Sequence, residues 1–176
     1  LQSIYKIKTR TGKIAEVNSF YTDTFNSVGK FDFVLANPPF NVKGKDKNKQ
    51  TIIDPVKIKG DPRYYLGLPI TGSGDISNAN YLWMQMFASA LNNKGRAGFV
   101  MANSASDAGN AEKEIRKKMI EAGMVDVIIS VGTNMFMNAP ADLMISFWNA
   151  AAGKWSNAVN NAATATNAQP PSTVLT

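Results

Sequence analysis

The chain has 176 residues, of which 44% are hydrophobic and 18% charged, a composition typical of a folded domain rather than a disordered chain. No apolar run approaches the ~20 residues that a membrane-spanning helix needs, and the first residues lack the layout of a signal peptide, so we expect a cytoplasmic protein without a membrane partner. The net charge of +6 favours a polyanionic partner such as DNA.

Two residue types are missing altogether, cysteine and histidine. Without cysteine there is no disulfide, no thiolate nucleophile and no cysteine zinc site. Without histidine there is no Ser-His-Asp triad, no imidazole base and no H-E-x-x-H metal site. Any chemistry must therefore depend on other polar side chains, such as Asn, Asp, Glu, Lys, Ser or Tyr, or on a bound cofactor.

The first eighty residues contain one clear element. Residues 1–30 are mixed and polar, with only hints of strand. Residues 31–36 (FDFVLA) are a short apolar run stopped by two prolines, which predicts a strand buried on both faces, as in a parallel sheet. Residues 41–80 predict a long loop, and such a loop is usually either functional or disordered.

Helices and strands then alternate. In chain order they are a helix capped by Asn78 or Asn80 and ended by Lys94-Gly95, a strand over 97–101, a helix over 111–122 followed by Gly123, and strands over 125–131 and 143–148. This order predicts a parallel α/β sheet with right-handed crossovers. Because only a loop joins the last two strands, we expect them to pair antiparallel.

Side-chain spacing predicts which faces of the two helices are buried. The first helix is expected to bury Tyr81, Trp83 and Met84, and the second Ile115, Met119 and Ala122. The charged residues of the second helix are expected to face solvent, namely Glu112, Glu114, Arg116 and Lys117.

The tetrapeptide Asn37-Pro38-Pro39-Phe40 follows the first predicted strand directly. Ligands of parallel sheets bind beyond the carboxyl ends of the strands. Two prolines fix two φ angles and remove two N–H donors, which leaves a stiff corner with carbonyl oxygens, an amide and an aromatic ring. The Asn37 side-chain oxygen and the Pro38 carbonyl can each accept one hydrogen of an exocyclic amine, while the Phe40 ring stacks on the base.

Such a corner suits the amine of adenine. This amine is a poor nucleophile because its lone pair is delocalised into the ring, and two acceptors on its hydrogens favour a localised lone pair. The nitrogen can then attack a methyl sulfonium in line. This reaction needs neither histidine nor cysteine, whereas methylation of cytosine C5 needs a thiolate and is excluded.

Residues 31–40 (FDFVLANPPF) resemble motif IV of the amino-directed DNA methyltransferases. Further segments are similar to the methylation subunit of type I restriction–modification systems, namely 41–44 (NVKG), 78–83 (NANYLW), 95–101 (GRAGFVM), 114–116 (EIR) and 125–130 (VDVIIS). The resemblance runs in order from about Asp23 to Ser130. It implies a Rossmann-like, class I α/β methyltransferase fold that is incomplete on its N-terminal side. The implied activity is N6-adenine DNA methylation with S-adenosylmethionine as cofactor.

The resemblance also assigns site residues. Asn37, Pro38, Pro39 and Phe40 carry over as the catalytic tetrapeptide, and Asn37 also addresses the methyl end of the cofactor. The family's glycine-rich cofactor loop is not recognisable in residues 1–30, and Asn18 stands where the family tends to place an acidic residue. We therefore interpret residues 1–148 as the catalytic portion of a larger methyltransferase subunit, which binds the cofactor weakly by itself. Residues 149–176, rich in Ala and Asn, are expected to form a disordered tail.

Four lysines after the tetrapeptide are candidates for contacts with double-stranded DNA: Lys43, Lys45, Lys47 and Lys49. They have no apolar neighbour to anchor them, so we expect a loop that is mobile without DNA; the alternative is a solvated loop with no DNA contact.

The resemblance implies a specificity subunit and a restriction subunit as partners. Two other functions stay open, a non-catalytic scaffold with a methyltransferase fold and a protein glutamine methyltransferase, since the corner also suits a glutamine amide.

Overall fold

The computed structural model describes residues 4–8, 14–131 and 143–149, with 4–8, 14–17 and 143–149 described by their backbone alone. The predicted tail therefore lies outside the described residues, apart from Asn149. Within the described part, no helix is long and apolar enough to cross a membrane. The elements in chain order are β1 (Ile4–Lys8), β2 (Ile14–Asn18), β3 (Phe31–Ala36), α1 (Pro55–Ile58), the 3₁₀ helix η1 (Pro62–Tyr64), α2 (Asn80–Ala90), β4 (Leu91–Ala102), α3 (Ser104–Asp107), α4 (Asn110–Glu121), β5 (Val125–Val131) and β6 (Leu143–Asn149).

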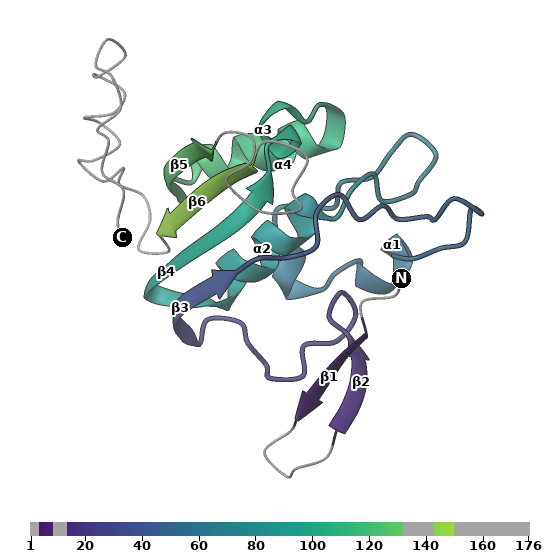
Figure 1. The fold of residues 1–176 in the computed structure, drawn as a ribbon, viewed down its shortest axis with the longest axis horizontal. Coiled ribbons are helices and arrows are strands. Elements are labelled where there is room, and N and C mark those ends of the chain that lie inside the picture. Colours follow the sequence, from purple (N-terminus) through teal and green to yellow (C-terminus); the bar gives the residue numbers. More distant parts are fainter. Residues whose placement is uncertain (1–3, 9–13, 132–142, 150–176) are drawn as a thin grey trace.

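Four strands form the main sheet in the order β3-β4-β6-β5, while β1 and β2 pair as a separate antiparallel hairpin (Figure 1). β3 is parallel to β4, and β6 lies antiparallel between β4 and β5. β3, β4 and β5 therefore point in one direction and the last strand runs against them, as the sequence predicts. Ala36 pairs with Phe99, so the residues after β3 lie beside the last residues of β4.

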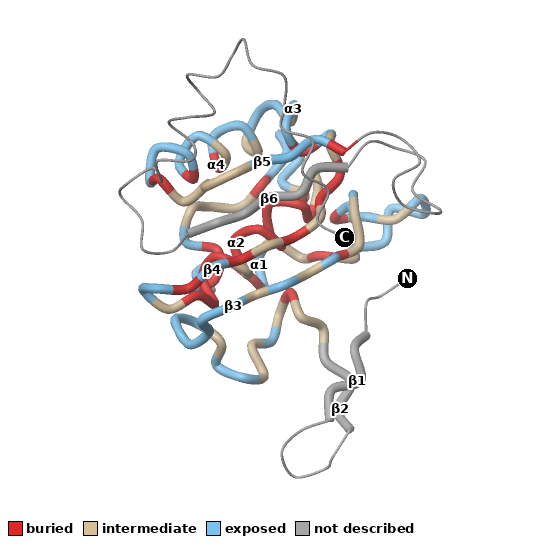
Figure 2. The backbone as a smooth tube through the Cα atoms, turned by 60° about the vertical axis from the view of Figure 1, so that its left-hand side comes forward, coloured by how far each residue is buried: buried red, intermediate tan, exposed pale blue. Residues whose placement is uncertain are grey.

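Helix α2 packs against one face of the sheet and is buried on nearly all sides (Figure 2). Only Met86 and Phe87 among its residues are partly exposed. Leu82 and Met84 belong to a core that includes Phe99 of β4, and the loop over residues 41–79 covers the rest of the helix. Burying one side chain of this size contributes about 1.5–3 kcal/mol to the free energy of unfolding. Because α2 buries several such side chains against the sheet and the loop, it stabilises the position of the loop.

The predicted end of this helix is wrong. The helix ends at Ala90, and β4 begins at Leu91, which pairs with Phe31. Gly95 therefore lies within the strand, where a Cβ atom would come 2.7 Å from the Phe31 carbonyl oxygen. The glycine allows the close approach of the two strands and does not end a helix.

The predicted burial of β3 on both faces is also wrong. Val34 and Ala36 pack against the core, whereas Phe33 is 74% and Leu35 86% exposed. β3 is an edge strand with a single neighbour in the described sheet, and α2 covers one of its two faces.

The predictions for α4 hold in part. The helix buries Ile115 and Met119 as expected and is followed by Gly123 with a φ of +65°, but Ala122 is exposed. The short helix α3, which immediately follows β4, is absent from the sequence prediction.

Candidate functional site

The tetrapeptide forms a corner at the carboxyl end of β3, directly after Ala36. Asn37 is exposed, Pro38 is buried, and Pro39 and Phe40 are half-buried. The Asn37 side chain makes no hydrogen bond within the described part of the chain, so its amide is available to a ligand. One part of the Phe40 ring packs against the core, and the rest faces solvent.

The residue that follows the corner is held by several hydrogen bonds. Asn41 has a φ of +55°, a left-handed conformation that asparagine tolerates better than most residues. Its backbone N–H donates to Asn80 Oδ1 at 3.0 Å, and its Oδ1 accepts from Asn80 Nδ2 at 3.0 Å. The same oxygen accepts from Asn78 Nδ2 at 3.1 Å and from Ser104 Oγ at 3.3 Å. The corner is thereby connected to the starts of α2 and α3.

The two asparagines at the start of α2, Asn78 just before the helix and Asn80 as its first residue, make different hydrogen bonds. Asn78 Oδ1 accepts the backbone N–H of Asn80 at 2.8 Å, but the N-cap position is Ala79, so the prediction that Asn78 or Asn80 caps the helix is wrong by one residue on either side. Asn80 is the first helical residue and is 1% exposed, with its side chain bonded to Asn41. The sequence predicts Asn80 only as a possible cap and does not reveal its contact with Asn41. The only signal was that two asparagines compete for one capping position.

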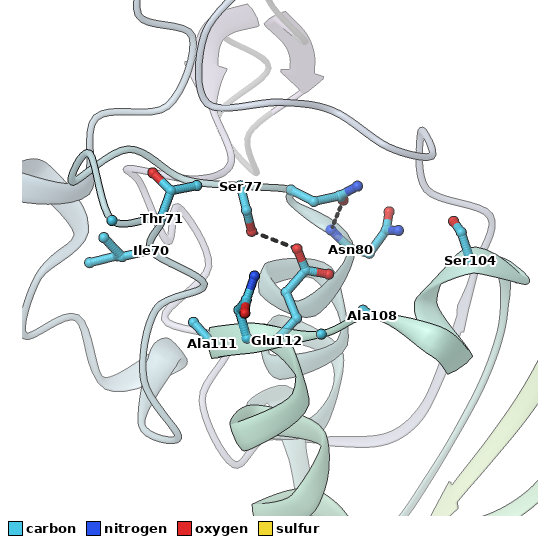
Figure 3. A pocket seen from close by; sticks show the side chains of 12 residues that line it. Ile70, Thr71, Ser77, Asn80, Ser104, Ala108, Ala111 and Glu112 are labelled. Carbon is cyan, nitrogen blue, oxygen red and sulfur yellow. Dashed lines mark hydrogen bonds between the residues drawn. The ribbon is translucent and has the colours of Figure 1, made fainter.

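A cavity of about 380 Å³ lies next to this asparagine cluster (Figure 3). Asn80 and Ser104 lie at one side, and Glu112 reaches from α4 to Ser77, whose Oγ donates to Glu112 Oε1 at 2.5 Å. The volume is in the range of small-molecule sites. The cavity does not include the tetrapeptide itself and adjoins it through the partners of Asn41.

Two residues predicted to face solvent are in fact partly buried and bonded. Glu112 contacts Ser77 across the cavity, and Arg116 Nη1 donates to the carbonyl oxygens of Ala105 and Ala108 at 3.2 and 2.8 Å. Arg116 also lies 3.3 Å from Tyr81 Oη. Burial raises the pKa of Tyr81, which keeps the hydroxyl protonated as a donor to the Ala105 carbonyl.

The four lysines are all exposed, but the loop backbone is anchored, contrary to expectation. The Gly44 N–H donates to the Ile76 carbonyl at 3.0 Å, where a Cβ atom on Gly44 would clash at 2.6 Å. Asp46 Oδ1 closes the loop tip by accepting two backbone N–H groups at 2.8 Å. Lys45 Nζ pairs with Asp75 at 2.9 Å, and the hydrogen bond from Lys45 lowers the pKa of that carboxyl.

Asn18 and Asn37, the predicted cofactor residues, follow different sheets: Asn18 is the last residue of β2 in the two-stranded sheet, and Asn37 comes directly after β3 of the four-stranded sheet. Asn18 ends β2, and its Oδ1 accepts the Phe20 N–H at 2.9 Å, so this oxygen is already engaged. The amide of Asn37, which has no hydrogen-bond partner among the described residues, can donate a hydrogen bond to a ligand or accept one from it. Asn18 fits the role of a ribose acceptor poorly, since its Nδ2 group can only donate.

Comparison with known sequences identifies the family to which this chain is similar. The family described as N-6 DNA Methylase matches residues 3–162. The MjaIX methylase subunit of a type I restriction enzyme from Methanocaldococcus jannaschii is 39% identical over 145 residues, covering 81% of this chain and 24% of the relative. The HindI methylase subunit from Haemophilus influenzae is 34% identical over 121 residues, covering 68% of this chain and 24% of the relative.

Comparison with solved structures supports the fold. The methyltransferase subunit of a type I restriction-modification system from Streptococcus thermophilus superposes with a TM-score of 0.59 at 22% identity, covering 80% of this chain and 28% of that one. The EcoKI M protein superposes with a TM-score of 0.52 at 20% identity, covering 76% and 23%. These likenesses confirm the predicted Rossmann-like α/β methyltransferase fold. The chain spans about a quarter of the length of the curated relatives it matches, and it belongs to the N-6 DNA methylase family.

Proposed function

We propose that this chain carries the catalytic corner of an adenine-N6 DNA methyltransferase, the methylation subunit of a type I restriction–modification system. The observation that carries the proposal is the exposed amide of Asn37 at the carboxyl end of β3, which has no hydrogen-bond partner among the described residues, in a chain of the N-6 DNA methylase family. The relatives' names favour DNA as the substrate over the amide of a protein glutamine and over a non-catalytic scaffold. The proposed partners are a specificity subunit and a restriction subunit.

The proposed mechanism assigns one task to each of three groups of the corner: the Asn37 amide, the Pro38 carbonyl and the Phe40 ring. When bound, S-adenosylmethionine would supply an electrophilic methyl group: its C–S bond breaks as the new N–C bond forms, S-adenosylhomocysteine leaves, and the methylated amine loses one proton to solvent. Asn37 Oδ1 and the Pro38 carbonyl accept the two amine hydrogens of a flipped adenine and so localise the nitrogen lone pair for in-line attack. The solvent-facing part of the Phe40 ring stacks on the base. The prolines hold these groups at fixed mutual positions, because their φ angles cannot vary.

The direct test is transfer of a labelled methyl group from S-adenosylmethionine to DNA, followed by identification of the methylated nucleoside. The assay uses the complete protein that carries this sequence, together with its specificity subunit. The parent should form N6-methyladenine and Asn37→Ala should form none. Asn93→Ala, which removes an exposed asparagine of β4, is the matched control and should transfer normally. Near-parental transfer by Asn37→Ala would refute the assignment.

The cofactor should bind weakly to the chain by itself. Affinity needs backbone donors from a glycine-rich turn for the carboxylate and an acidic acceptor for the ribose. The sequence of residues 1–30 contains no recognisable glycine-rich turn, and Asn18 is a neutral residue whose Oδ1 already accepts the Phe20 N–H. Losing several kcal/mol of contacts lowers affinity tenfold per ~1.4 kcal/mol. Titration calorimetry on the 176-residue chain measures this. A micromolar dissociation constant would show that residues 1–30 contain a cofactor site.

A further inference from the structure

The corner is held from both of its ends. On its N-terminal side, Ala36 pairs with Phe99 in the sheet. On its C-terminal side, Asn41 is bonded to Asn80 in both directions, through backbone N–H to Oδ1 and through Nδ2 to Oδ1. The intervening tetrapeptide contains two prolines with fixed φ angles, so it has few torsions with which to absorb a shift at either end.

The contact between the two asparagines is specific and buried. Asn80 is 1% exposed, and its side-chain oxygen and nitrogen both bond to Asn41. A buried amide that loses its partner cannot recover it from water. Asn41 is also held in a left-handed conformation. Without its partners, Asn41 has little reason to keep this conformation, and the chain direction at Phe40 would change.

We infer that Asn80 and Asn41 are positioning residues for methyl transfer, an inference that rests on the proposed function. They do not touch the base. They determine where Asn37 and Phe40 lie relative to the sheet edge, because the stiff corner transmits any displacement of Asn41. A misplacement of about 1 Å at a reacting group can cost a hundredfold in rate.

The first test is Asn80→Ala in the complete protein with its specificity subunit, with kcat and KM for DNA measured separately. We expect kcat to fall tenfold or more, on the order of the loss caused by misplacement, while KM changes little. Gln85→Ala is the matched control. Gln85 is a fully buried amide on the same helix, bonded to Leu66 and Gly67 away from the corner. It should lower thermal stability and leave kcat unchanged.

Conservative variants separate positioning from a general structural role. Asn80→Asp keeps the acceptor for the Asn41 N–H but puts a carboxylate oxygen in place of the Nδ2 donor to Asn41 Oδ1, so its kcat should lie between those of the parent and Asn80→Ala. Asn41→Asp keeps the oxygen that accepts three donors and should retain most of kcat. Asn41→Gly keeps the left-handed φ but loses the side chain, and Asn41→Ala loses both. The expected order of kcat is therefore Asp, Gly, Ala.

Three results would overturn the inference: a parental kcat for folded Asn80→Ala, equal losses of kcat in Asn80→Ala and Gln85→Ala, or an Asn41 series that does not follow the expected order. If Asn80→Ala does not fold, the Asn41 series decides. Failure of the proposed function can be distinguished from failure of this inference, because Asn37→Ala would remain active if the proposed function were wrong. An inactive Asn37→Ala together with a fully active Asn80→Ala would contradict only the positioning role.

Discussion

Helix α2 and strand β3 lie against each other, yet their apolar residues have opposite environments. Leu82 of α2 is 0% exposed, whereas Leu35 of β3 is 86% exposed. The sheet and the loop over residues 41–79 enclose α2 from two sides, while β3 is an edge strand with one covered face. Both segments are mostly apolar, so the difference shows that burial depends on the segments that enclose them and not on their own residues alone.

This contrast bears on how the corner is held. The strand before Asn37 has a single neighbour in the described sheet. The residues after Phe40 are bonded to α2, through Asn41 and through the Val42 carbonyl, which accepts the Ala79 N–H at 2.8 Å. Helix α2, the most completely buried helix in the part of the chain that the structure describes, therefore supports the corner from its C-terminal side.

The largest expected effect is the difference in unfolding free energy between two leucine-to-alanine variants. Leu82→Ala should cost about 3 kcal/mol of unfolding free energy because it leaves a cavity in the core. Leu35→Ala removes the same atoms from an exposed side chain and should change stability by less than about 0.5 kcal/mol. Urea unfolding of the chain, followed by tryptophan fluorescence, measures both. Equal costs would contradict the contrast between α2 and β3.

A smaller effect, on the binding of DNA, is expected at Phe40, which is partly packed against the core and partly exposed. Phe40→Ala should weaken engagement of the flipped base by ~1–3 kcal/mol, the usual contribution of base–aromatic stacking, while Phe40→Tyr or Trp should be tolerated. The affinity of the parent and the variants is measured for DNA with the target adenine and for DNA without it. The difference between the two affinities gives the contribution of stacking on the flipped base. If Phe40→Ala lowers only the unfolding free energy and not this difference, the ring has a packing role alone.

The smallest effects per residue are expected in the lysine loop. Lys43, Lys47 and Lys49 are exposed and form no ion pair with any described residue, whereas Lys45 is paired with Asp75. Replacing the three unpaired lysines with Gln should reduce the salt slope of DNA binding by about three units if each meets one phosphate. Lys45→Gln serves as a control and should change the slope less. An unchanged slope after replacement of all four would exclude the contact.

Sequence patterns predicted the elements that depend on local periodicity. The strand over residues 31–36, the helix after Asn78, the helix before Gly123 and the antiparallel last strand are all present. The exposed face of β3 was missed because burial depends on which segments cover a strand, which its own residues do not determine.

The long-range side-chain contacts were also beyond the sequence analysis. Asn41 and Asn80 lie far apart in the chain, and the loop that brings them together contains no periodic pattern. Glu112 and Arg116 have the spacing of a solvated face, but the cavity and the turn after α3 bring partners to them. The identity of the corner, by contrast, depends on contiguous residues and was recognisable.

The central claim is that Asn37 accepts a hydrogen of the adenine amine, and the single-turnover rate of methyl transfer tests it most directly. Asn37→Leu has a similar shape without an acceptor and should lower the rate at least about a hundredfold, the usual loss when one such hydrogen bond is removed. Asn37→Asp retains an acceptor oxygen and should keep a measurable rate. A Leu variant as fast as the parent, or as fast as the Asp variant, would contradict the claim.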